Sequence, residues 1–99
     1  MTDCCLTLVA PPELEDKLLD LLLVQAGDAP FTSGVVDSHG GASQALSMLE
    51  QVRGRRRACQ VQVLLAAGRC QVLLQLLRSQ FAGTGLRYWV LPVQEEGLL

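Results

Sequence analysis

The spacing of apolar residues changes along the chain and divides it into short segments. The first apolar run, Cys4 to Ala10, ends at Pro11 and Pro12, which is typical of a strand and the turn that stops it. An amphipathic helix is predicted next, because Pro12 suits a first helical turn and Gly27 and Pro30 suit its end. The apolar stripe of this helix consists of Leu14, Leu18, Leu21 and Leu22.

Two further strands are predicted in the middle of the chain. Phe31 to His39 is rich in β-branched residues, and Gly34 within it indicates a bulge or a bend. A connection of roughly Gly40 to Arg53 follows, in which Ser43 is a possible N-cap of a helical turn. In the next segment, "RRACQVQVLLA", apolar and mostly polar positions alternate, which predicts a strand with one face in the core. Its core positions are Cys59, Val61, Val63 and Leu65.

The last third of the chain repeats the helix and strand pattern. A second helix is predicted from about Ala67 to Phe81, and Gly83 and Gly85 terminate it. Leu86 to Val93 is the last strand, and Pro92 places its end at a sheet edge. The stripe of the second helix consists of Cys70, Leu73, Leu74, Leu77 and Phe81.

The order βαββαβ predicts a single α+β domain over residues 1–99 with the ferredoxin-like fold, an antiparallel four-stranded sheet with two helices on one face. Two helices cannot cover both faces of such a sheet. The other face must therefore be wet or pack against another subunit. Its candidate residues mix apolar and polar side chains, which is typical of an oligomer seam: Gln62, Leu64, Trp89 and Leu91.

Composition and charge narrow the class of protein. About half of the residues are hydrophobic (49%), which excludes a disordered chain, and the net charge of −2 gives no reason to expect nucleic acid. No secretory signal is recognisable, and the apolar run Leu18 to Val24 is too short to span a bilayer. The four cysteines include no C-x-x-C pair, so we expect a reduced, cytoplasmic protein with buried thiols.

Several segments resemble a small family of uncharacterised PII-like proteins, within the larger PII and CutA-like group. The resemblance runs across nearly the whole chain, and its most specific parts are "SHG" and "EQVRGR". It implies a ferredoxin-like homotrimer whose intersubunit clefts bind small effectors. It also implies that the loop at residues 40–53 meets a partner protein. Members of this family are often encoded beside heavy-metal efflux pumps, which implies a role in metal homeostasis and a membrane transporter as a partner.

The sequence departs from signalling PII proteins at two places. Those proteins use a longer loop after the second strand, and a glycine loop that carries a lysine to hold the phosphates of ATP. Here the corresponding segment "FAGTGLRYW" keeps Gly83 and Gly85 but has no lysine, and its nearest cation is Arg87.

Asp37 and His39 are candidate metal ligands. Residues two apart on a strand point to the same side, so the carboxylate and the imidazole can converge on zinc, copper or nickel. Two ligands make half a site, and copies from neighbouring subunits or a cysteine must complete it. The alternative is a loop histidine that caps a turn made by Gly40 and Gly41.

The run "RGRRR" is a candidate anion site. On a strand, Arg55 and Arg57 share one side and Arg56 the other, and Arg53 precedes them. Guanidinium groups pair with phosphates and carboxylates in two-bond geometry, so an adenine nucleotide, bicarbonate or an acidic surface fits. The alternative is ion pairing between subunits, with Glu50 or with the acidic first helix.

The glycine loop and the first two cysteines are weaker candidates. Gly83 and Gly85, with Arg87 close by, can cradle an anion on backbone N–H groups, although a glycine pair after a helix is more often a Schellman-type helix stop. Cys4 and Cys5 face opposite sides of the first strand, so one belongs to the core and the other can reach the seam or a soft metal ion. Tyr88 and Trp89 are expected to pack at the sheet and the subunit interface.

Three functions remain open at this point. An enzyme is not expected, because one histidine and no convincing acid pair or nucleophile offer no catalytic set. The leading hypothesis is a trimeric PII-like regulatory protein that binds a nucleotide or another anion between subunits. The second is a soluble metal-binding accessory protein of heavy-metal homeostasis, which holds a transition metal ion on Asp37 and His39. The third is a structural oligomer with no small ligand.

Overall fold

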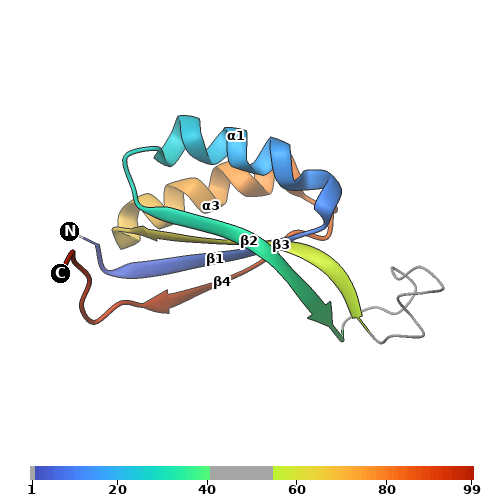
Figure 1. The fold of residues 1–99 in the computed structure, drawn as a ribbon. Coiled ribbons are helices and arrows are strands. Elements are labelled where there is room, and N and C mark those ends of the chain that lie inside the picture. The colour runs from blue at the N-terminus through green and yellow to red at the C-terminus, as the bar shows by residue number, and fades with distance from the viewer. Residues whose placement is uncertain (1, 41–54) are drawn as a thin grey trace.

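The computed structural model, which describes residues 2–40 and 55–99, contains a four-stranded sheet and two α-helices (Figure 1). The elements follow the predicted order, and their bounds are β1 (Cys4–Ala10), a 3₁₀ turn η1 (Pro12–Leu14), α1 (Glu15–Ala26), β2 (Phe31–His39), β3 (Arg55–Leu65), α3 (Ala67–Phe81) and β4 (Arg87–Pro92).

The sheet is antiparallel throughout, in the strand order β2-β3-β1-β4. The strands β1 and β3 are therefore central, and β2 and β4 form the edges. Both helices lie against the same face of the sheet (Figure 1). This arrangement confirms the predicted ferredoxin-like fold, with two helices on one side.

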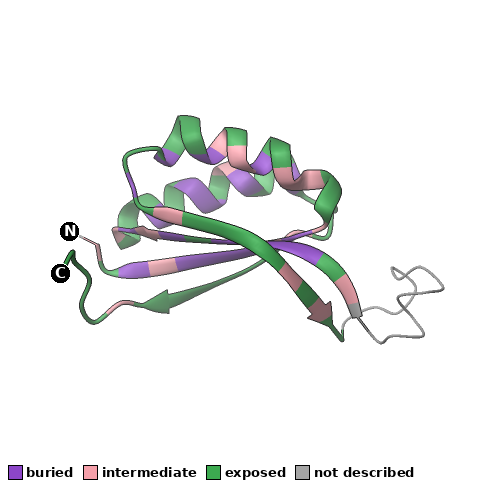
Figure 2. Ribbon diagram, in the orientation of Figure 1, coloured by how far each residue is buried: buried purple, intermediate pink, exposed green. Residues whose placement is uncertain are grey.

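The core lies between the helices and the sheet face that they cover (Figure 2). Leu6 is at its centre, fully buried, with Val63 opposite it on β3 and Val90 opposite it on β4. All residues of the apolar stripes predicted for the two helices belong to this core or pack against it. The members of the stripe of α3 are all buried, at 4% exposure or less: Cys70, Leu73, Leu74, Leu77 and Phe81.

The start of α3 is fixed by a residue far away in the sequence. Ala67, its first residue, donates its backbone N–H to Oδ1 of Asp3 over 2.6 Å. A helix leaves its first N–H groups without partners inside the helix, and a carboxylate also suits the positive end of the helix dipole. Asp3 therefore anchors α3 to the beginning of β1.

Replacing Asp3 with alanine is expected to lower the free energy of unfolding by about 1 kcal/mol, the usual cost of losing a capping side chain. Chemical denaturation measures the change. Asp3→Asn is the matched control, because its side-chain oxygen still accepts from Ala67, and it should recover most of the loss. Equal losses in both variants would show that the cap is not what Asp3 contributes.

Two details of the backbone differ from the sequence-based prediction, and a third prediction is not tested. Gly34 was predicted to mark a bulge or a bend; it pairs with Gln60 in an unbroken register, so β2 has no bulge there. The N-terminal helix begins with the 3₁₀ turn, closed by a bond from Leu14 N–H to Pro11 O, and becomes α-helical only at Glu15. The helical turn proposed after Ser43 lies outside the described residues.

The end of α3 is a β-turn instead of the Schellman motif. Thr84 donates its N–H to the carbonyl of Phe81, Ala82 has φ −58° and ψ 134°, and Gly83 has φ 75°. These values match a type II turn, whose third residue needs a positive φ and therefore favours glycine. Gly83 thus supplies the positive φ that this turn needs.

The second sheet face carries no helix (Figure 1). The register places Cys5 between Leu64 and Leu91, and Thr7 between Gln62 and Trp89. We call this surface the open face. The four predicted seam residues all lie on it: Gln62, Leu64, Trp89 and Leu91. Leu91 is 52% exposed and Trp89 39% exposed, which leaves apolar surface in water that a monomer does not cover.

Among the described residues, neither helix has the length and apolar character that crossing a membrane requires.

Candidate functional site

The strands β2 and β3 continue past the rest of the sheet as a two-stranded ribbon (Figure 1). The pairing of β1 with β3 stops at Ala10 and Cys59, whereas β2 and β3 remain paired as far as His39 and Arg55. We call residues 36–39 and 55–58 the ribbon. Alternation along each strand gives it two sides.

Asp37 and His39 lie on the same side of the ribbon, as predicted from their spacing. Arg57 is the direct cross-strand partner of Asp37, and Arg55 is the partner of His39. Directly opposed side chains such as those of Asp37 and Arg57 lie within reach of each other. One side of the ribbon therefore combines one carboxylate position with an imidazole and two guanidinium positions, a net positive set.

Arg56 occupies the other side of the ribbon, opposite Ser38. The register therefore agrees with the prediction that Arg55 and Arg57 share one side of the strand and Arg56 lies on the other. Asp37, His39 and Arg57 are all exposed, so a ligand from solvent can reach them. Arg53 lies outside the described residues.

As a metal site, the ribbon holds two of the ligands that a transition metal needs. Within residues 2–40 and 55–99, no group of three or more His, Cys, Asp or Glu side chains gathers in one place. Zinc takes four ligands in structural sites and three protein ligands in catalytic ones. Asp37 and His39 of one chain therefore need ligands from elsewhere.

The glycine loop, residues 83–85, follows α3 and precedes β4. Both glycines have positive φ, 75° at Gly83 and 89° at Gly85. A Cβ on Gly85 would meet Cγ of Pro11 at 3.7 Å, so this loop packs beside the end of β1. Arg87 pairs with Val9, which places it on the open face. The loop thus lies between a helix end and the open face.

The ribbon and the glycine loop lie at the same end of the sheet but not side by side. Arg87, Val9, Gln60 and Gly34 form one row across the four strands. That row spans three strand spacings, about 14 Å, and His39 lies five residues farther along β2, about 17 Å. The two halves of the predicted anion site therefore do not converge within one chain.

The cysteines divide as predicted between the core and the open face. Cys4, Cys59 and Cys70 are buried, and Cys5 is half-buried on the open face. Burial, followed by a hydrogen bond that the Cys70 S–H makes to the neighbouring Cys4, raises the pKa of the Cys70 thiol to about 11. Burial also raises the pKa of Cys59, with Glu15 as a second cause. At neutral pH these two thiols stay protonated, which favours packing over metal binding or catalysis.

Sequence reasoning missed a contact between α3 and β4. Arg78 donates from Nη2 to the hydroxyl of Tyr88 over 3.0 Å, and its guanidinium carbon lies 5.6 Å from the centre of the tyrosine ring. Tyr88 faces the helices, not the subunit seam, because it pairs with Leu8 of the core. The sequence does contain a signal for this: Tyr88 and Trp89 are neighbours on a strand, so their side chains must point to opposite faces of the sheet. The same register places Trp89 on the open face.

Residues 1–99 match a protein family described as "Protein of unknown function (DUF3240)". No match is found among curated proteins.

The solved structures with a similar fold include the following three. A DUF3240 family protein from Shewanella baltica OS155 has a TM-score of 0.76 and 22% identity, covering 100% of this chain and 98% of that one. CPII, a nitrogen regulatory PII-like protein from Thiomonas intermedia K12 bound to ADP, AMP and bicarbonate, has a TM-score of 0.72 and 12% identity, with coverage of 100% and 98%. The periplasmic divalent cation tolerance protein CutA from Archaeoglobus fulgidus has a TM-score of 0.66 and 12% identity, with coverage of 99% and 88%.

Proposed function

Because the chain belongs to the DUF3240 family and shares its fold with PII-like and CutA proteins, we propose that it is a PII-like regulatory protein that acts as a homotrimer. The open face supports this proposal, because it leaves Leu91 and Trp89 partly in water on a single chain. Sister chains provide the cover that the two helices do not.

The effector is a small anion, an adenine nucleotide or bicarbonate, held in a cleft between subunits. The arginines at 53, 55 and 57 of one chain supply one wall, and Gly83, Gly85 and Arg87 of a neighbour supply the other. The observation that carries this assignment is the separation of the ribbon from the glycine loop within one chain, which only a second chain can bridge. CPII, a relative in fold, has been solved bound to ADP, AMP and bicarbonate, which supports this class of effector.

Binding of the effector signals to a partner through residues 40–53, which join the two strands of the ribbon. An anion between the arginines changes the charge and the surface that this connection presents. A membrane transporter such as an efflux pump is the partner that the family resemblance implies. The protein has a regulatory role and no enzymatic one, and we place it in the cytoplasm, where its buried thiols stay reduced.

Replacing Arg57 with alanine is expected to weaken binding of ADP, AMP or bicarbonate at least about tenfold, because a charge-assisted pair is lost. Isothermal titration calorimetry measures the change. Arg56→Ala is the matched control, since Arg56 lies on the other side of the same strand. No heat with any of these anions, or equal affinity in the Arg57 and Arg56 variants, would reject the effector site.

The alternative function is a metal-binding accessory role in heavy-metal homeostasis. Asp37 and His39 share one side of β2, and copies from other subunits or other donors complete the coordination. CutA, a structural relative, is described as a divalent cation tolerance protein. Equilibrium dialysis with zinc, copper and nickel tests this role: His39→Ala should lose the bound ion, whereas Ser38→Ala should keep it. Unchanged binding in the His39 variant would exclude this site.

A further inference from the structure

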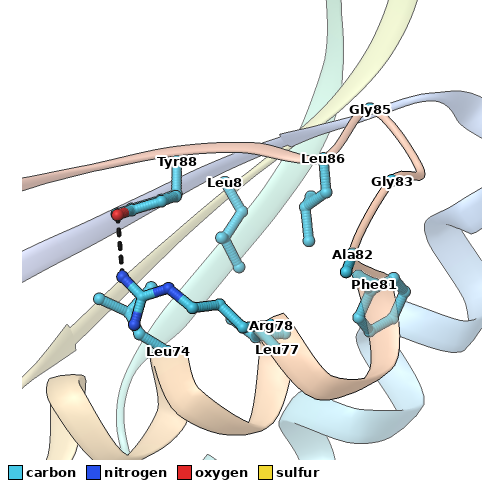
Figure 3. Close-up of a pocket in the computed structure, with 10 residues that line it drawn as sticks. All are labelled: Leu8, Leu74, Leu77, Arg78, Phe81, Ala82, Gly83, Gly85, Leu86 and Tyr88. Atoms are coloured by element: carbon cyan, nitrogen blue, oxygen red, sulfur yellow. Dashed lines mark hydrogen bonds between the residues drawn. The ribbon is translucent and has the colours of Figure 1, made fainter.

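A cavity of about 160 Å³ lies between α3, the glycine loop and the edge strand β4 (Figure 3). Its floor is apolar and buried: Leu8 from β1 and Leu74, Leu77 and Phe81 from α3 are each at most 4% exposed. Ten residues line it, namely Leu8, Leu74, Leu77, Arg78, Phe81, Ala82, Gly83, Gly85, Leu86 and Tyr88.

Arg78 and Tyr88 form the polar end of the cavity. The hydrogen bond between them bridges α3 and β4 beside Leu8, and Ala82 and Phe81 lie at the other end (Figure 3). Because the tyrosine oxygen accepts from Arg78, its own O–H remains a donor, and the guanidinium has further N–H donors. The ten lining residues include no acidic side chain, so this end of the cavity attracts an anion.

We propose that this cavity binds a small apolar monocarboxylate, with the carboxylate on Arg78 and Tyr88 and the apolar body among the leucines. A cavity of about 150 Å³ lined by leucine and phenylalanine side chains accommodates benzene. A guanidinium group matches the planar carboxylate in two-bond geometry. An adenine nucleotide does not suit this space, because pockets for ligands of drug size measure roughly 300 Å³ or more.

The inference goes beyond the proposed function, because every lining residue comes from one chain and the ligand carries an apolar group. The two sites meet at Gly83 and Gly85, which line the cavity and also belong to the proposed effector cleft. A carboxylate in the cavity is therefore placed to influence the loop that contacts the effector.

The test is a titration of the full-length protein with benzoate and isovalerate, followed by the NMR signals of leucine methyl groups. We expect saturable shifts of Leu74, Leu77 and Leu86, and at least about tenfold weaker binding in Arg78→Leu. Arg78→Lys keeps the charge but loses the two-bond geometry of the guanidinium, so its affinity should lie between those of the parent and Arg78→Leu. Arg69→Leu on the same helix is the matched control, because Arg69 pairs with Asp28 away from the cavity, and it should bind as the parent does.

Three results would overturn the proposal: no saturable shift of these methyl groups, unchanged affinity in Arg78→Leu, or equal binding of toluene and benzoate. A titration of the same sample with ADP separates the two sites. If ADP binds and benzoate does not, this inference fails and the proposed effector cleft stands. If benzoate binds and no adenine nucleotide or bicarbonate does, the reverse holds.

Discussion

Replacing Leu91 with glutamate is expected to convert the proposed homotrimer into monomers at micromolar concentration. Leu91 lies on the open face, in line with Cys5 and Leu64, and is 52% exposed in a single chain. Packing a sister chain over the new carboxylate would bury an unpaired charge, which costs several kcal/mol per ion. That corresponds to a weakening of association by a factor of about one hundred or more. Light scattering after size-exclusion chromatography measures the mass.

The monomer itself should fold, because residue 91 stays in contact with water when no sister chain is present. Val24→Glu is the matched control: Val24 is also an exposed apolar residue, at 79%, but it lies on α1. This variant should keep the parent mass. If both variants keep the trimer, the open face is not the interface; if both lose it, the effect of the charge is not specific to the open face.

Replacing Leu6 with alanine should lower the free energy of unfolding by about 3.5 kcal/mol, the middle of the range for a buried leucine. Leu6 has no exposed surface and lies on a central strand, with Val63 and Val90 as its cross-strand neighbours. The cavity left behind cannot collapse easily, because strands pair with β1 on both sides. Urea denaturation at a fixed protein concentration measures the loss.

Leu23→Ala is the control for this prediction. Leu23 is 61% exposed on α1, and substitutions at such positions usually change stability by no more than about 0.5 kcal/mol. A loss at Leu6 as small as the loss at Leu23 would contradict the position of the core.

The fold could be predicted from the sequence because both helices have an apolar stripe of helical period and β3 alternates between buried and polar positions. The strand Phe31–His39 and the helix Ala67–Phe81 have the predicted bounds, and all five stripe positions of α3 are buried. Errors occurred where backbone geometry, not burial, decides the outcome. The type II turn at Gly83 and the unbroken register at Gly34 depend on dihedral angles and pairing, which a hydrophobic pattern does not contain.

The candidate site could be predicted only in part. Period-two alternation correctly placed Asp37 with His39, and Arg55 with Arg57. The pairing of Asp37 with Arg57 depends on how β2 and β3 align, and residue spacing alone does not fix that register. The bond between Arg78 and Tyr88 joins a helix to a strand across a turn, so no single periodic pattern contains both residues.

The mass of the protein in solution tests the central claim most directly, because a covered open face and an intersubunit effector cleft both require more than one chain. At micromolar concentration, light scattering should give about three times the 10.7 kDa of one chain. A mass of one chain would show that the open face is left to water, and it would contradict both the intersubunit cleft and the shared metal site.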